Sequence, residues 1–368
     1  MKIEVLQENL VKSVAWASRF VAIKPSLPIL SKLKVVGSKG KLVLVATNME
    51  TGVRVEVGAR VEGEGELAIP AKLLYEYINL LPAGKIQLSV ENDGLKLVSA
   101  GYKARVAGES VADFPELPIM ESKQKFRLSS DDLGRIVRLV GFCASSELTR
   151  PVLTAVLFEF KKSGLRVVST DGYRLSMLKK IKISGEMGEV KLLIPRGVLA
   201  EVDRLVSEVG SSEVTVSYSE EQKSLVFEIG SVTVMSRLIE GEFPAYEKII
   251  PKEGLVSVAL KRGELMEVVK AASIFARDNA HIVKWLIVGG KLKVSAHAAA
   301  VGEQESEIDV EVLKEGEGEI AFNSRFLIDL LGSVSDGRVE FEMSDSLTPG
   351  LFRSSDKGFV HVVMPVRV

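Results

Sequence analysis

The segment "KFRLSSDDLGRIVRLVGFC" (125–143) begins with alternating apolar residues and continues with apolar residues at helical spacing. Phe126 and Leu128 keep the two-residue period of a strand. Leu133 and Val137 keep the i, i+4 period of one helix face. The segment therefore predicts a strand that leads directly into an amphipathic helix.

The same pattern occurs twice more, in "KIEVLQENLVKSVAWASRF" (2–20) and "SVALKRGELMEVVKAASIF" (257–275). A second set of similar segments reads as strand, turn and helix start, with Pro, Pro and Asn at the turn. Its members are "LAIPAKLL" (67–74), "LLIPRGVL" (192–199) and "IAFNSRFL" (320–327).

A third set recurs in the same order, in "LVLVATN" (42–48), "LRVVSTD" (165–171) and "LKVSAHA" (292–298). Recurrence of several patterns at a fixed period indicates repeated structural units. We predict three copies of one α+β domain, each with two helices and two antiparallel sheets. The Pro-bearing stretches near residues 122 and 250 suit the joins. The predicted domains are 1–122, 123–250 and 251–368.

The composition is that of a globular protein with a large core, since 46% of the 368 residues are hydrophobic. Lys and Arg total 48 against 49 Asp and Glu, so binding to nucleic acid would depend on where the charges lie. The single cysteine, Cys143, excludes an intrachain disulfide and fits a reducing cytoplasm. It lies in an apolar run, which predicts a buried small hydrophobic residue. No apolar run is long enough to span a membrane, and the first residues do not form a signal peptide.

Motifs for catalysis are missing from the chain. No phosphate-binding glycine loop, zinc-protease motif or nucleophile elbow is present, and His281, His297 and His361 are far apart in sequence. We expect no catalytic residue, no metal and no cofactor. The acid-rich stretch 303–319 alternates with Val and Ile, as a strand with one solvated face does.

The stretch "VSTDGYRLSM" (168–177) contains Asp-Gly between two strand-like runs, which predicts a two-residue hairpin with positive φ at Gly172. Asp171 is then expected to support the turn. The alternative is an enzyme, a hydrolase that uses Asp171 together with a distant histidine.

Basic residues gather on the predicted helices, whereas many acidic residues lie on strands and hairpins. If the helices line one surface, that surface is positive and suits sequence-independent contacts with DNA phosphates. The alternative is that these are ordinary solvated helix faces. The residues concerned are Lys12, Arg19, Lys72, Arg135, Arg138, Arg196, Arg204, Lys261, Arg262, Lys270, Arg277 and Arg325.

Five segments spread over all three copies resemble the bacterial sliding clamp family, the β subunit of DNA polymerase III. These segments are "KPSLPIL" (24–30), "TDGYRLS" (170–176), "EGEFPAYEKIIP" (240–251), "FNSRFLIDLL" (322–331) and "VVMPVRV" (362–368).

The resemblance implies a head-to-tail homodimer whose six similar domains form a ring around duplex DNA, with helices inside and sheets outside. Such a ring is a non-catalytic processivity factor in the cytoplasm, associated with the nucleoid. Its implied partners are double-stranded DNA, the DNA polymerase III α subunit, the clamp loader complex and other replication and repair proteins that carry clamp-binding peptides, with no membrane. A monomeric repeat scaffold that binds proteins without encircling DNA is the second hypothesis.

The resemblance also implies three sets of site residues. Lys24, Lys72, Arg150 and Arg196 would contact DNA, and Lys24 stands where the family usually has Arg. Ala104, Ile274 and Phe275 would lie at the dimer seam. The site for partner peptides would adapt to apolar anchor side chains. It would include Leu153, Thr170, Gly172, Tyr173, Arg174, Leu175, Pro244, Lys248, Ile249, Leu347, Val362, Met364, Pro365, Val366 and Arg367.

Overall fold

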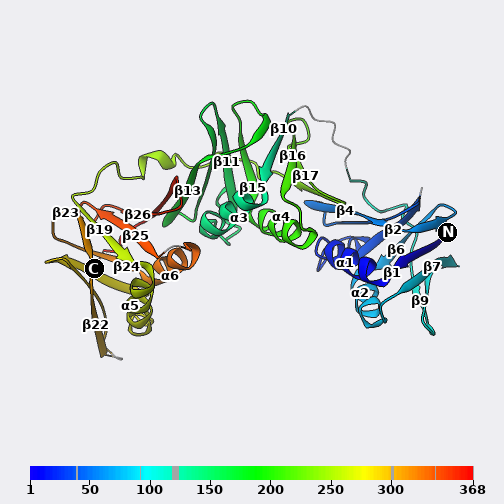
Figure 1. Ribbon diagram of the computed structural model, residues 1–368, viewed down its shortest axis with the longest axis horizontal. Helices are drawn as coiled ribbons and strands as arrows, with labels where there is room; N and C mark the ends of the chain where they lie inside the picture. Colours follow the sequence, from blue (N-terminus) through cyan, green and yellow to red (C-terminus); the bar gives the residue numbers. More distant parts are fainter. Residues whose placement is uncertain (39, 92, 118–123, 300–301, 336, 368) are drawn as a thin grey trace. The chain divides into compact units, whose positions relative to one another are not determined.

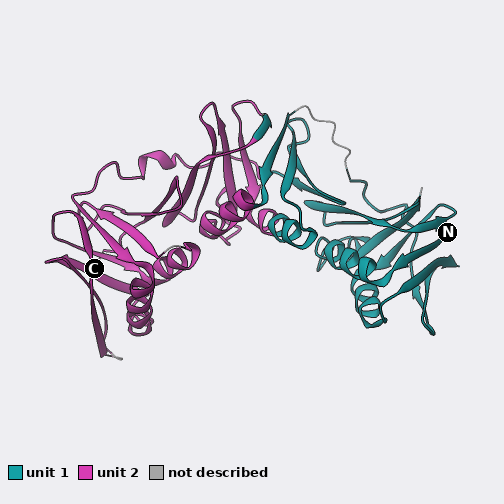
Figure 2. Cartoon of the chain, viewed as in Figure 1, with its two compact units in different colours: residues 1–130, 184–186, 201–238 teal, residues 131–183, 187–200, 239–368 magenta. Residues whose placement is uncertain are grey.

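The structure is a computed structural model that describes residues 1–38, 40–91, 93–117, 124–299, 302–335 and 337–367. The chain divides into two compact units (Figure 2). Unit 1 contains residues 1–130, 184–186 and 201–238, and unit 2 contains residues 131–183, 187–200 and 239–368.

Unit 1 contains two antiparallel sheets, which the labels of Figure 1 locate. The five-stranded sheet has the order β5-β1-β7-β8-β9, with β1 (Lys2–Leu6), β5 (Arg60–Glu62), β7 (Lys85–Glu91), β8 (Gly94–Ser99) and β9 (Tyr102–Ala107). The nine-stranded sheet has the order β14-β10-β16-β17-β18-β4-β3-β2-β6. Its strands are β2 (Lys32–Ser38), β3 (Lys41–Thr47), β4 (Thr51–Gly58), β6 (Gly65–Pro70), β10 (Gln124–Ser129), β14 (Ser184–Glu186), β16 (Glu213–Ser219), β17 (Ser224–Ile229) and β18 (Val232–Arg237).

Unit 2 also contains two antiparallel sheets. The four-stranded sheet has the order β22-β21-β20-β24, with β20 (Ile282–Val288), β21 (Lys291–Ala298), β22 (Gly302–Asp309) and β24 (Gly318–Asn323). The nine-stranded sheet has the order β15-β11-β12-β13-β27-β26-β25-β19-β23. Its strands are β11 (Ala155–Lys161), β12 (Gly164–Thr170), β13 (Arg174–Ile181), β15 (Lys191–Pro195), β19 (Val256–Lys261), β23 (Glu311–Lys314), β25 (Arg338–Met343), β26 (Gly350–Ser354) and β27 (Phe359–Val363).

Six α-helices occur in the described residues, two for each predicted copy. The unit boundary passes through two of them, because α3 has its first residue in unit 1 and α4 its last nine residues there. The helices are α1 (Gln7–Ser18), α2 (Ala71–Leu80), α3 (Ser130–Leu139), α4 (Arg196–Val209), α5 (Arg262–Phe275) and α6 (Ser324–Ser333).

The predicted strand-to-helix segments are confirmed in all three copies, where β1, β10 and β19 lead directly into α1, α3 and α5. Leu10 and Val14 of α1 are buried, as the helical period requires. The predicted helix starts are also confirmed, since α2 follows Pro70 and α4 follows Pro195. At α6, the Asn323 Oδ1 accepts a hydrogen bond of 3.0 Å from the Arg325 backbone N–H and caps the helix.

The sheets differ from the prediction of two separate sheets in each copy. Strand β4 of the first copy pairs with β18 of the second, and β13 of the second pairs with β27 of the third. Neighbouring copies therefore share continuous sheets, and four sheets replace the expected six in the described part of the chain. Pairing the outer edges satisfies backbone groups that would otherwise be open.

The acid-rich stretch forms β22 and β23. Most of β22 alternates between exposed and half-buried residues, as predicted for a strand with one solvated face, whereas all four residues of β23 are exposed. None of the helices in the described residues is long and apolar enough to cross a membrane.

Candidate partner-binding surface and DNA-contact residues

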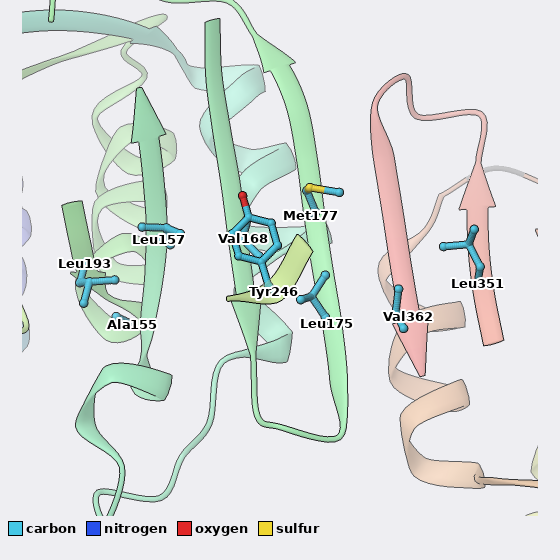
Figure 3. Close-up of a cluster of buried hydrophobic side chains, with 9 residues drawn as sticks. All are labelled: Ala155, Leu157, Val168, Leu175, Met177, Leu193, Tyr246, Leu351 and Val362. Atoms are coloured by element: carbon cyan, nitrogen blue, oxygen red, sulfur yellow. The ribbon is translucent and has the colours of Figure 1, made fainter. Parts of the chain in front are cut away.

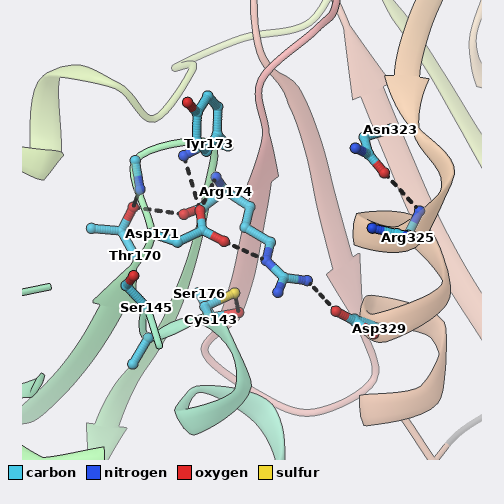
Figure 4. Close-up of polar contacts among 12 residues, drawn as sticks. Cys143, Ser145, Thr170, Asp171, Tyr173, Arg174, Ser176, Asn323, Arg325 and Asp329 are labelled. Atoms are coloured by element: carbon cyan, nitrogen blue, oxygen red, sulfur yellow. Dashed lines mark hydrogen bonds and ion pairs between the residues drawn. The ribbon is translucent and has the colours of Figure 1, made fainter. Parts of the chain in front are cut away.

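The turn before β13 is held by the side chain of Asp171 (Figure 4). Its Oδ1 accepts hydrogen bonds from the backbone N–H groups of Tyr173 and Arg174, at 2.9 and 3.0 Å. Thr170 Oγ1 accepts from the Gly172 N–H at 3.0 Å and donates to the Arg174 carbonyl at 2.6 Å. These bonds confirm the structural role expected for Asp171, and the φ of 94° at Gly172 confirms the expected left-handed residue.

The predicted length of this turn was wrong. Thr170 pairs with Leu175 across the ladder, so four residues rather than two form the loop. The carboxylate of Asp171 makes the longer loop stable, because it binds two backbone N–H groups that a two-residue turn would not leave free.

Beyond the turn, an apolar floor forms where β13 pairs with β27. Leu175 lies opposite Val362 in the ladder, and both side chains are buried. They belong to one hydrophobic cluster that also includes Tyr246 and Leu351 (Figure 3). The structure therefore brings together two predicted members of the partner site, Leu175 and Val362, from segments far apart in sequence.

Two apolar side chains, each two residues away from a floor residue in the sequence, are exposed. Tyr173 is 66% exposed and Met364 is 37% exposed. The Met364 backbone N–H donates a 2.9 Å hydrogen bond to the Tyr173 carbonyl, which ties the C-terminal segment to the turn. We call Tyr173, Leu175, Val362 and Met364 the partner surface. Contiguous exposed apolar patches commonly mark a binding site.

The guanidinium of Arg174 is already engaged within the protein. Its Nε lies 2.9 Å from Asp171 Oδ2, and its Nη1 lies 2.7 Å from Asp329 Oδ2 on α6 (Figure 4). The same group covers the ring of Phe326 at 4.7 Å. Arg174 therefore connects the turn to α6 and supports the partner surface from below.

The remaining predicted members of the partner site lie on nearby segments of unit 2. Leu153 is buried on η3 (Pro151–Thr154), whereas Leu347 is exposed in the turn before β26. Pro244, Lys248 and Ile249 belong to the exposed stretch around η4 (Tyr246–Lys248). In the terminal segment, Pro365 and Val366 are half-buried, Arg367 is exposed, and the Val366 N–H bonds to the Ala321 carbonyl.

Sequence reasoning did not identify Tyr246, which anchors the stretch before β19. Its ring belongs to the apolar cluster, and its hydroxyl donates to Glu159 Oε2 at 2.9 Å and accepts from Arg166 Nη1 at 3.0 Å. Burial raises the pKa of Tyr246, so the hydroxyl stays protonated. Tyr246 lies within the segment "EGEFPAYEKIIP" (240–251), but its partners Glu159 and Arg166 are far away in sequence, so no local pattern indicated these contacts.

A second missed group is a buried polar cluster behind the partner surface. Ser176 Oγ lies 2.7 Å from His361 Nδ1 and 3.2 Å from Cys143 Sγ. Burial raises the pKa of Cys143 to about 12, so the thiol is a poor nucleophile and the expectation of a buried residue is confirmed. Burial and the Arg174 charge lower the pKa of His361 to about 3, so its imidazole is neutral.

No group of three or more His, Cys, Asp and Glu side chains that could hold a metal occurs among the described residues.

The predicted DNA-contact residues all lie on exposed positions. Lys24 precedes η1 (Pro28–Ser31), Lys72 is in the first turn of α2, and Arg150 precedes η3. Arg196 begins α4, and its Nη1 donates to the Ala144 carbonyl at 3.3 Å. By contrast, Arg19, which directly follows α1, is neutralised by Glu201 and Glu208, at 2.6 and 2.7 Å.

The predicted seam residues lie on an open sheet edge and on a helix. Ala104 is on β9, the last strand of the five-stranded sheet, with β8 on one side only. Ile274 of α5 is 53% exposed, and its neighbour Phe275 is half-buried. In unit 2, β22 is likewise the last strand of its sheet. An open edge strand can accept a strand from another chain.

Comparisons with known proteins cover the whole chain. Family models of the DNA polymerase III beta subunit match its N-terminal domain at residues 1–118, its central domain at 127–245 and its C-terminal domain at 247–367. The beta sliding clamp of Synechocystis sp. is 28% identical over 100% of both chains. That of Chlamydia muridarum is 29% identical over 98% of this chain and 96% of its own.

Solved structures are also similar over the full length. The sliding clamp of Bartonella birtlesii bound to griselimycin has a TM-score of 0.94 and 30% identity, with 100% of each chain covered. The beta subunit of Thermotoga maritima has a TM-score of 0.92 and 27% identity, with 100% of this chain and 99% of that chain covered. The chain therefore belongs to the bacterial sliding clamp family, the β subunit of DNA polymerase III.

Proposed function

We propose that two copies of this chain form a closed head-to-tail ring that encircles duplex DNA and tethers the replicative polymerase to it. The observation that carries the proposal is the full-length match to all three domains of the DNA polymerase III beta subunit. The three domains would meet near residues 122 and 250. The protein would have no catalytic role and would act in the cytoplasm, where the nucleoid lies.

The open edge strands support the ring. β9 ends one sheet and β22 ends another, and in a head-to-tail dimer each edge would meet its complement on the second copy. Ala104 would lie in this seam, with Ile274 and Phe275 beside it.

Topological enclosure explains why the chain needs no strong charge. A ring is retained by closure, so Lys24, Lys72, Arg150 and Arg196 need supply only weak, salt-dependent phosphate contacts. A net charge of −1 is compatible with this mode of binding.

The partner surface would hold short peptides of the polymerase α subunit, the clamp loader and other replication and repair proteins. The exposed Tyr173 and Met364, which are joined by a backbone hydrogen bond, and the buried Leu175 and Val362 of the adjoining strands would offer apolar contact for anchor side chains. In support, the Bartonella relative and that of Pseudomonas aeruginosa have been solved with griselimycin. A tethered polymerase stays near the primer end at high effective concentration.

The test of this surface is the affinity for a fluorescent peptide of the α subunit. Tyr173→Ala removes an exposed aromatic contact and should weaken binding about tenfold, in the range of an interface hot spot. Leu80→Ala truncates an exposed apolar residue of α2 and serves as the matched control. Equal affinity for Tyr173→Ala and the unmodified protein would show that the partner surface lies elsewhere.

A further inference from the structure

A cavity of about 130 Å³ lies in unit 1, beside the turn that precedes β4. Its walls come from three places in the sequence: the turn and first residues of β4 (47, 49–52), the segment 115–117, and the adjoining ends of β17 and β18 (224, 235–237). Figure 1 labels β4 and β17, which lie in the same nine-stranded sheet.

In the repeat, this cavity occupies the position in the first copy that the partner surface occupies in the second. Asn48 Oδ1 accepts from the N–H groups of Glu50 and Thr51, at 3.0 and 2.7 Å, as Asp171 does in the second copy. In the ladders, Gly52 lies opposite Met235 in the way that Leu175 lies opposite Val362. Similar segments lie beside both sites: "DFPEL" (113–117) beside the cavity and "EFPAY" (242–246) beside the partner surface.

Glycine at position 52 creates the difference between the two places. A Cβ atom there would collide with Leu117 Cδ2, so the linker leucine occupies the space that a larger side chain at position 52 would need. The remaining cavity lies against two methionines, Met235, which is buried, and Met49, which is 48% exposed. A cavity of about 150 Å³ holds one benzene, so this one has room for a single apolar side chain.

One residue of the cavity wall carries a buried hydroxyl without a hydrogen-bond partner in the described part of the chain. Ser224 is 6% exposed, and its Oγ has no hydrogen-bond partner within the described part of the chain. Buried polar atoms are nearly always bonded, so an orphan in a cavity wall points to a polar group of a ligand.

The charges on the cavity walls indicate which kind of ligand the cavity would bind. Glu50 and Glu116 are exposed there, against one cation, Arg237. The excess of carboxylate favours a ligand with a positive group close to its apolar anchor.

We propose that this cavity is a second peptide-docking site, which takes one aliphatic side chain of an extended protein segment with a basic residue beside it. Met49 and Met235 contact the anchor, Ser224 Oγ bonds a backbone group next to it, and Glu50 and Glu116 attract the basic residue. The comparison with the partner surface rests on the function proposed above, whereas the cavity, the orphan hydroxyl and the charges do not.

The experiment follows the methyl NMR signals of the full chain labelled at methionine, during titration with acetyl-Arg-Leu-amide. Met49 and Met235 should shift together and saturate, and acetyl-Glu-Leu-amide should bind at least about threefold more weakly. Met364 reports the partner surface separately, so failure of the partner surface and failure of the second site are distinguishable. Tyr173→Ala should leave the Met49 and Met235 shifts unchanged.

Two variants test the assigned contacts. Ser224→Ala should weaken the arginyl probe about three- to tenfold, the range for a lost hydrogen bond. Glu50→Lys with Glu116→Lys, both on the surface, should reverse the preference between the two probes. Glu8→Lys on α1, exposed in the same unit, is the control and should change neither. Unmoved Met49 and Met235 signals, or equal binding of both probes, would overturn the proposal.

Discussion

One side-chain oxygen performs the same task in two copies of the repeat. Asp171 Oδ1 and Asn48 Oδ1 each accept two backbone N–H groups, so the turn requires an acceptor and not a charge. Asp171 has a further task, because its Oδ2 pairs with Arg174 at the base of the partner surface. The carboxylate therefore holds the turn and positions Arg174.

Substitutions at Asp171 separate these roles. Asp171→Asn keeps the turn acceptor but loses the ion pair with Arg174, whose two side chains are only 11% and 17% exposed, so it should cost about 1–2 kcal/mol of unfolding free energy. Asp171→Ala loses this ion pair and both turn bonds, so it should cost more, about 2–4 kcal/mol. Urea unfolding measures both. If both variants lowered the unfolding free energy equally, the hydrogen bonds to Oδ1 would not be what stabilises the turn.

His361 couples the stability of unit 2 to pH. Its folded pKa of about 3 lies below the ordinary value of 6.5, so its neutral form is the stable one in the fold. The stabilisation is fully present above pH 6.5 and is lost as pH falls from there toward 3, by roughly 1.4 kcal/mol for each pH unit.

The prediction is checked by urea unfolding between pH 7 and pH 4 with His361→Gln, which cannot titrate. The slope of unfolding free energy against pH should be shallower in this variant than in the unmodified protein. His297→Gln, at an exposed position, is the control and should keep the original slope. If all three proteins had the same slope, protonation of His361 would not lower the unfolding free energy.

At the scale of elements, the two sheets of unit 2 are held together by aromatic rings. Trp285 of β20 and Phe322 of β24 contact Phe341 of β25 and Phe352 of β26, with ring centroids 5.2 to 6.1 Å apart. Gly350 begins β26 beside them, and a Cβ atom there would lie 2.5 Å from Phe322 Cζ and 2.8 Å from Phe341 Cε2. Glycine at this strand position is required by close packing.

Gly350→Ala should therefore overpack the cluster and lower the unfolding free energy by about 1–3 kcal/mol. The matched control is Gly332→Ala on α6, where an added Cβ meets nothing within 4 Å. It should stabilise the helix by about 0.5–1 kcal/mol. Thermal unfolding would decide, and a Gly350→Ala protein as stable as the original would contradict the packing argument.

Local patterns predicted the elements better than they predicted how the copies join. Period and turn residues located each strand-to-helix segment, because those signals lie within about twenty residues. The pairings of β4 with β18 and of β13 with β27 join strands far apart in sequence, and nothing local in either strand specifies its partner. For the same reason Tyr246 and the Ser176–His361 contact were missed, whereas Tyr173 and Leu175 were found through resemblance to a known family.

For the whole molecule, the proposed ring depends on a seam between copies. Ile274→Asp places a charge on an exposed apolar residue predicted to lie in that seam, so it should convert a dimer of about twice 40.0 kDa into monomers. Leu148→Asp also replaces an exposed aliphatic residue with a carboxylate, at a position outside the predicted seam, and should leave the dimer intact. Light scattering at micromolar concentration measures the mass. Dimers in both variants would place the seam elsewhere.

Enclosure of DNA is the central claim, and retention on nicked circular DNA tests it most directly. The protein is placed on the circle by a clamp loader, washed at raised salt to remove phosphate-bound protein, and counted before and after the circle is cut. The ring predicts that it stays on the circle and slides off the linear product within the time of the assay. Equal retention on circular and linear DNA, or loss from both, would contradict enclosure and favour a scaffold that binds proteins without encircling DNA.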